Sequence, residues 1–251
     1  MEVPAPGEEE AFIMRETNGP ETYPLVWRID DPPPSDGGER NQYDVNTATF
    51  KKFTAEKKIS LATPDLHGCS CLAIVSRKGV YITHYWESIA YAPAEDDDDE
   101  KELPEEEQVA LFEKYVLSGL REGIKGPKIT EQVPLRSNAK DLEDDHTYAY
   151  LIHPSPSPHN RNGYEKEAQK IRAVVEEYLP KIKSSGRWTL VPYVVEDDPD
   201  VRDTTSAGRA LFQYDPKEAD PQRRGYWTAK MKLWSETRVI HEDVWDYNRR
   251  G

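Results

Sequence analysis

Apolar and polar positions follow the clearest pattern in the middle of the chain. A nearly unbroken apolar run at 71–75 is typical of a buried strand, and the segment 80–86 follows it after the turn pair Lys78-Gly79. The two segments predict a β-hairpin. Further strands are predicted at 147–152, 188–195, 209–214 and 226–234.

Two other segments have apolar residues at helical spacing. The first starts at Leu103-Pro104, where a proline in the first turn and three following glutamates favour a helix N-terminus, and its stripe is Val109, Phe112, Val116 and Leu120. The second helix is predicted over 164–182, with a stripe formed by Ala168, Ile171, Val175, Tyr178 and Ile182. Because strands and helices do not alternate regularly, we expect an α+β fold, with a mostly antiparallel sheet or sandwich core flanked by at least two helices.

The N-terminal part of the chain has a different composition. Residues 1–45 are rich in Glu, Pro and Gly and can bury little, so they predict a poorly ordered or loosely docked arm. No linker divides the remainder, so 46–251 is predicted to be a single α+β domain.

Charge excludes two classes of partner. The 33 Lys and Arg against 47 Asp and Glu give a net charge of −14, which repels nucleic-acid phosphates and anionic membranes. The opening residues lack the pattern of a secretory signal, and no apolar run approaches the roughly 20 residues that span a bilayer. We expect a protein of the cytoplasm, or one delivered into a target cytoplasm.

The candidate chemistry lies at the start of the predicted hairpin. Cys69 and Cys71 are two residues apart, which excludes a disulfide framework, and Gly68 permits a tight turn into the strand at Cys69. His84 follows fifteen residues after Cys69 on the paired strand, so the hairpin brings it back toward the cysteine. A thiol becomes an effective nucleophile as the thiolate, which requires such a nearby base.

Leu66-His67-Gly68-Cys69 resembles the Leu-Ser-Gly-Cys signature of the glutamine-deamidating toxins of the cytotoxic necrotizing factor type, with His67 in place of the serine. The spacing from Cys69 to His84 is similar to that of these toxins. Thr63 resembles the threonine that completes the Thr–Cys–His site of the CheD chemoreceptor deamidases. The resemblance covers 63–84 and implies a β-sandwich core with flanking helices, a metal-independent site without a cofactor, and deamidation of a glutamine in a folded partner protein.

In this hypothesis Cys69 attacks the carboxamide, His84 takes its proton and Thr63 orients the imidazole. Backbone N–H groups from Gly68 to Ser70 would stabilise the oxyanion. Two further candidates follow His84 directly, since Trp86 and Glu87 could wall a substrate cleft.

Other interpretations remain open. Cys69 and His84 could be a small buried side chain and a hydrogen-bonded core histidine, and Cys71 shares the strand face of Cys69 as a competing nucleophile. The chain could then be a non-enzymatic scaffold, in which acidic loops and the aromatic segment 226–234 contact a basic protein.

Metal sites are not expected. His153 and His159 lie in a proline-rich loop without a third ligand, and the run Asp96–Asp99 lacks the alternating ligands and the glycine of a calcium loop.

The predicted substrate of the enzyme is a surface glutamine of a folded protein. Loops at a strand end form an open cleft better than a closed pocket. Free glutamine offers little remote binding energy to orient its amide, so it should be a poor substrate.

Overall fold

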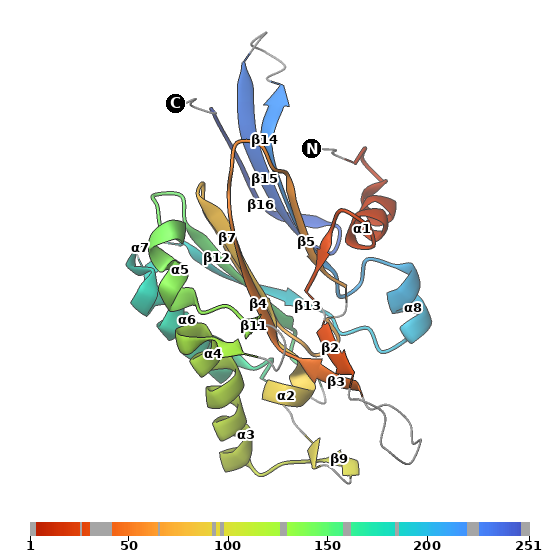
Figure 1. Cartoon of the computed structure of the whole chain (residues 1–251). Helices are drawn as coiled ribbons and strands as arrows, with labels where there is room; N and C mark the ends of the chain where they lie inside the picture. The colour runs from red at the N-terminus through yellow and green to blue at the C-terminus, as the bar shows by residue number, and fades with distance from the viewer. Residues whose placement is uncertain are drawn as a thin grey trace. The chain divides into compact units, whose positions relative to one another are not determined.

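The computed structural model of the chain confirms the α+β class (Figure 1). It describes residues 4–25, 27–30, 42–64, 66–91, 94–95, 98–125, 130–157, 162–183, 186–219 and 226–246. The internal contacts divide the chain into two compact units. Unit 1 comprises Met1–Pro24, Lys51–His67 and Tyr193–Gly251, and unit 2 comprises Leu25–Phe50 and Gly68–Pro192. Residues of the predicted N-terminal arm, 1–45, belong in part to unit 1 and in part to unit 2.

Among the described residues, seven strands form the sheet of unit 2, in the order β10-β11-β4-β7-β6-β12-β13. Their bounds are β4 Thr47–Lys52, β6 Cys71–Val75, β7 Gly79–His84, β10 Ile124–Lys125, β11 Thr130–Gln132, β12 Tyr148–Pro154 and β13 Trp188–Tyr193. Strand β6 pairs antiparallel with both β7 and β12. All of β6 and β7 is buried, which explains why these strands are continuous apolar runs.

The predicted hairpin is confirmed. Ala73 lies opposite Ile82 and Val75 opposite Val80, and the connection between the strands passes through Lys78. Beyond the strand ends, Ser70 and Tyr85 form a further antiparallel bridge. The pairing therefore continues as far as the residue next to Cys69.

Helices line one side of this sheet in Figure 1. They are α2 Glu87–Ala90, α3 Glu105–Phe112, α4 Ser118–Glu122, α5 Leu135–Leu142, α6 Glu165–Tyr178 and α7 Pro180–Lys183, with a π-helical segment η1, Glu113–Leu117, between α3 and α4. Their apolar residues pack with alternate residues of the sheet, such as Leu72, Tyr81 and Leu151, in one core. This core stabilises unit 2 by removing apolar area from water.

Both predicted helices exist, each with an interruption. The second stops at Tyr178 and starts again at Pro180, because proline lacks the N–H that would continue the helix. In the first, Phe112, Val116 and Leu120 are buried as predicted, but Val109 is 43% exposed. The wider turn of η1 shifts the phase of the stripe, so Val109 does not line up with the others.

Among the described residues, five strands form the sheet of unit 1, in the order β1-β5-β14-β15-β16. Their bounds are β1 Tyr23–Pro24, β5 Ile59–Thr63, β14 Ala210–Ala219, β15 Trp227–Ser235 and β16 Arg238–Asp246. All neighbours are antiparallel except β1 and β5. A register shift in the pairing of β15 with β16 leaves Ile240 between two paired residues, as in a β-bulge.

Helix α1, Glu9–Thr17, covers part of this sheet. Phe12 and Ile13 are buried against Leu211 and Trp234, and the Phe12 and Trp234 ring centroids are 5.5 Å apart. Helix α8, Pro199–Thr204, begins with Asp198, whose side chain accepts a hydrogen bond from the N–H of Asp200.

Two small antiparallel sheets complete the described elements: β2 Trp27–Asp30 with β3 Gln42–Val45, and β8 Ala94–Glu95 with β9 Asp98–Glu102. Among the described helices, none combines the length and the apolar character needed to cross a bilayer.

Candidate active site

Strand register brings both cysteines and His84 to one face of the hairpin. The pairs Ala73–Ile82 and Ser70–Tyr85 keep one continuous register, so Cys71 lies opposite His84 and Cys69 opposite Trp86. Side chains directly opposite share a face, and a diagonal neighbour is within reach of an aromatic ring. The fold therefore offers His84 two thiols, Cys71 straight across and Cys69 on the diagonal.

Cys69 enters this arrangement from a tight turn. Gly68 has a φ of +77°, a conformation that glycine adopts without steric penalty, as the sequence predicted for a turn before the strand. The backbone N–H of Ser70 donates to the Tyr85 carbonyl at 2.9 Å, and the Tyr85 N–H donates to the Ser70 carbonyl at 2.8 Å. The Ser70 N–H is therefore engaged in the sheet, which removes it from the predicted oxyanion donors.

Burial sets the protonation states of this cluster. Cys71 and His84 are fully buried, and Cys69 is 3% exposed. Burial lowers the pKa of His84 to about 3, because the buried site disfavours the charged imidazolium, so the ring is neutral at neutral pH. Burial raises the pKa of Cys71 to about 12, although a hydrogen bond from the Thr83 backbone lowers it in part. Cys71 is thus held as a thiol.

We expect Cys71 to resist alkylation in the folded protein. Since the ordinary thiol pKa is 9.0, a pKa of about 12 lowers the thiolate fraction on the order of 10³-fold near pH 8. Timed iodoacetamide labelling at pH 8, followed by fragment mass spectrometry to separate Cys71 from Cys69, measures this. Protein unfolded in urea is the control, in which both cysteines should label. Rapid labelling of Cys71 in the folded protein would contradict the assignment.

Trp86 and Glu87 differ in exposure. The backbone N–H of Trp86 donates to Asn46 Oδ1 at 2.7 Å, and its indole N–H donates to the Val45 carbonyl at 3.1 Å. These bonds fix the indole in the interior, with its ring centroid 4.7 Å from that of His84. Glu87 is half-buried, and its carboxylate accepts a hydrogen bond from the hydroxyl of Tyr164.

Thr63 belongs to unit 1. It is fully buried at the end of β5, where it lies opposite Ala210 of β14. The structure brings Gly68, Cys69 and His84 together within unit 2, whereas Thr63 is part of unit 1. Its predicted role of orienting the imidazole stays a prediction.

Sequence reasoning missed Tyr164. Its hydroxyl reaches Glu87 from 77 positions further along the chain, and its ring centroid lies 4.7 Å from that of Tyr91. Tyr164 has a φ of +57°, which is uncommon for a residue with a side chain. The pair Gly163-Tyr164 before a helix marked a boundary, but no periodic pattern connects it to Glu87.

The predicted absence of a metal site rested on two segments. Nδ1 of His153 lies 3.0 Å from the Pro154 carbonyl and 3.1 Å from the Gly163 carbonyl, so this nitrogen is engaged by the backbone. His159, Asp96 and Asp97 lie outside the described residues. In the part of the chain that the structure describes, no group of three or more His, Cys, Asp or Glu side chains is arranged to hold a metal ion.

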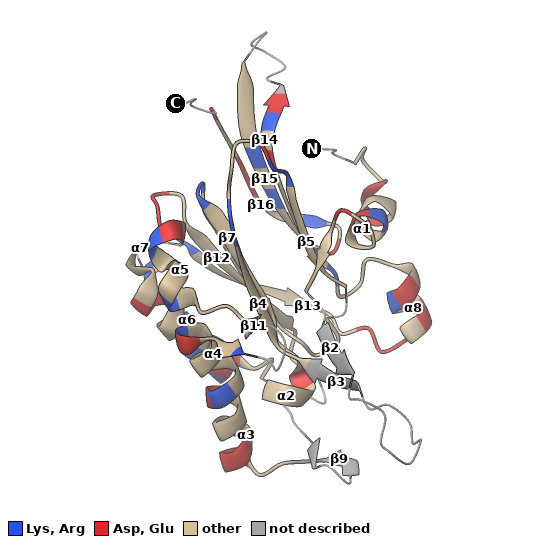
Figure 2. Cartoon of the chain, in the orientation of Figure 1, with Lys and Arg blue, Asp and Glu red and all other residues tan. Residues whose placement is uncertain are grey.

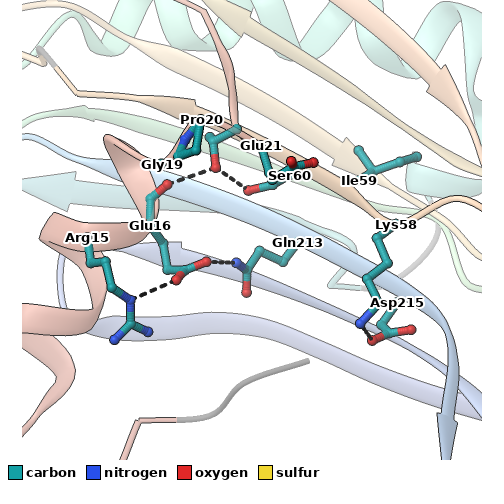
Figure 3. A pocket seen from close by; sticks show the side chains of 11 residues that line it. Arg15, Glu16, Gly19, Pro20, Glu21, Lys58, Ile59, Ser60, Gln213 and Asp215 are labelled. Carbon is teal, nitrogen blue, oxygen red and sulfur yellow. Dashed lines mark hydrogen bonds and ion pairs between the residues drawn. The ribbon is translucent and has the colours of Figure 1, made fainter.

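Unit 1 contains a cavity of about 460 Å³ (Figure 3). On one side of it, Glu16 accepts hydrogen bonds from Arg15 Nε at 3.1 Å and from Gln213 Nε2 at 2.7 Å. On the other, Lys58 Nζ is 2.7 Å from Asp215 Oδ2. Burial raises the pKa of Asp215, but hydrogen bonds from Lys58 and the Lys217 backbone outweigh it and bring the pKa to about 2. The lining includes none of the predicted site residues.

No family model matches the chain, and no curated protein matches it significantly. Among solved structures, the chain resembles the C-terminal domain of CNFy from Yersinia pseudotuberculosis, with 13% identity and a TM-score of 0.29. The match covers 80% of this chain and 59% of that domain, so the chain spans less than two thirds of the neighbour's length. This likeness is weak.

Proposed function

We propose that the chain is a thiol-dependent amidohydrolase that deamidates a glutamine on the surface of a partner protein. The observation that carries the proposal is the placement of Cys69, after a glycine turn of positive φ, diagonal to His84 on the paired strand. A nucleophile beside a base on rigid strands is the arrangement that covalent acyl transfer requires.

The reaction follows from these two side chains. His84 accepts the Cys69 proton as the sulfur attacks the carboxamide carbon, and the N–H of Gly68 in the turn stabilises the oxyanion. The imidazolium then returns the proton to the departing nitrogen, and ammonia leaves a thioester. Water attacks the thioester with His84 as base, which releases glutamate and restores the thiol.

The choice of Cys69 over Cys71 rests on access. Cys71 lies within β6, whereas Cys69 precedes the strand and adjoins the Gly68 turn. Both thiols are buried, so substrate binding has to open the strand end before attack. A protein surface supplies many contacts to offset that opening, and a free amino acid supplies few.

The test compares ammonia release from free glutamine, a short glutamine peptide and a lysate of folded proteins. We expect activity on the folded proteins, detected also as a mass gain of about one dalton per deamidated glutamine, and its loss in Cys69→Ser with an almost unchanged thermal melt. Cys71→Ser is the matched control and should retain activity. Survival of activity in Cys69→Ser, or its loss only in Cys71→Ser, would contradict the assignment of the nucleophile.

Exposed aromatic residues favour a second candidate function, a binding domain without catalysis. Tyr226 is 60% exposed and Trp227 is 53% exposed, whereas Trp234 at the other end of the predicted aromatic segment is buried. Tyr and Trp are enriched at protein interfaces. Absence of ammonia release from all three substrates, together with loss of a basic binding partner in a Tyr226→Ala, Trp227→Ala variant, would favour this function.

A further inference from the structure

The carboxylate of Glu87 lies directly beside the turn that carries Cys69. A Cβ atom placed on Gly68 would lie 1.7 Å from Glu87 Oε2 and 2.7 Å from Oε1. Glu87 therefore occupies the space that any side chain at position 68 would fill. Gly68 directly precedes Cys69, so the carboxylate lies beside the residue before the candidate nucleophile.

Tyr164 holds the carboxylate in this position. Its hydroxyl donates to Glu87 Oε1, and its ring packs against Tyr91. The backbone of Tyr164 has φ +57° and ψ +38°, a strained conformation for a residue with a side chain. A strained backbone conformation persists only where the surrounding structure holds it, and such conformations are more frequent at functional sites. The residue before Tyr164, Gly163, is also held in place, because its carbonyl oxygen lies 3.1 Å from His153 Nδ1.

Glu87 and Tyr164 form the accessible side of the turn. Both are half-buried, whereas Gly68, Cys69 and Trp86 are buried. Glu87 is the one charged residue in α2, Glu87–Ala90, and the ribbon of α2 is red in part in Figure 2. A group that approaches the turn on the side of Glu87 and Tyr164 therefore meets a fixed negative charge.

We propose that Glu87, held by Tyr164, is a specificity residue that selects glutamines with a lysine or arginine as a neighbour in the sequence. The inference rests on the proposed deamidase function and names its substrate class. A carboxylate at the rim of a site attracts a cationic neighbour of the target and repels an acidic one. The net charge of −14 favours the same choice during the approach of the two proteins.

The experiment uses one small folded carrier protein with a surface loop that presents glutamine next to lysine, alanine or glutamate. Deamidation of each loop is followed by mass spectrometry, and kcat/KM is compared. We expect the wild type to prefer the lysine loop over the glutamate loop on the order of tenfold, mainly through KM, and to lose most of this preference in high salt.

Two variants test the residues themselves. Glu87→Gln should bring the ratio of kcat/KM for the lysine loop to kcat/KM for the glutamate loop close to one. Tyr164→Phe should lower this ratio in part, because the carboxylate is no longer held. Glu106→Gln on α3, an exposed glutamate, is the matched control and should keep the wild-type ratio. A merely structural role of Glu87 would lower activity on all three loops equally, so the ratio would not move.

The outcomes separate this inference from the proposed function. Equal deamidation of the three loops by the wild type, or an unchanged ratio in Glu87→Gln and Tyr164→Phe, overturns the specificity role while the deamidase function stands. Deamidation of none of the loops above a Cys69→Ser blank overturns both.

Discussion

Acidification from pH 7.5 to pH 4.5 is expected to lower the free energy of unfolding of the wild type by about 3 kcal/mol more than that of a His84→Gln variant. Burial lowers the pKa of His84 from 6.5 to about 3 in the folded protein. The unfolded chain therefore binds the proton first. The contribution of His84 to stability is intact above pH 6.5 and is lost as the pH falls from 6.5 toward 3.

Urea unfolding at several pH values measures this difference. The carboxylates titrate in both proteins, so their effects cancel when the two pH profiles are subtracted. A pH profile of His84→Gln parallel to that of the wild type would show that His84 is protonated in the folded state or open to water.

Gly68→Ala is expected to lower the free energy of unfolding by about 3 kcal/mol in the wild-type background and by about 1 kcal/mol when Glu87 is already alanine. The smaller value is the cost of a side chain at positive φ. The remainder arises because the new methyl group displaces the carboxylate, which then gives up the hydrogen bond from Tyr164.

A double-mutant cycle of Gly68→Ala and Glu87→Ala, measured by urea unfolding, gives the coupling directly. We expect about 2 kcal/mol. Equal costs of Gly68→Ala in both backgrounds would mean that the carboxylate swings aside freely and is not held by Tyr164.

The parts of the fold that sequence predicted are those with a strong local signal. The apolar run of β6, the turn at Lys78-Gly79 and the amphipathic stripe of α6 can each be recognised from a short stretch of sequence alone. Helix α1 and strand β16 were missed. Helix α1 lies in a stretch rich in polar residues and buries only two apolar side chains. Strand β16 is exposed over much of its length. Neither segment therefore shows a clear periodic pattern of apolar residues.

The candidate site was likewise predictable only where its signal is local. A glycine before Cys69 and a histidine on the paired strand are local features of a hairpin. The direct opposition of Cys71 and His84 depends on the register, which shifts by one residue with the exact turn, and the sequence does not determine it. The contact of Tyr164 with Glu87 depends on how a distant helix packs, which no local pattern encodes.

The bulge at Ile240 has a consequence for solubility. Strand β16 is at the edge of the described sheet of unit 1, nine residues long, and free of lysine and proline, the residues that commonly guard such edges. A regular edge of this kind would offer a continuous row of hydrogen-bonding groups to another chain. The extra residue bends and twists the strand, so another chain could pair in regular register only with 241–246, six of its nine residues. We therefore expect the bulge, together with Glu242 and Asp243 in the centre of the strand, to limit edge-to-edge aggregation.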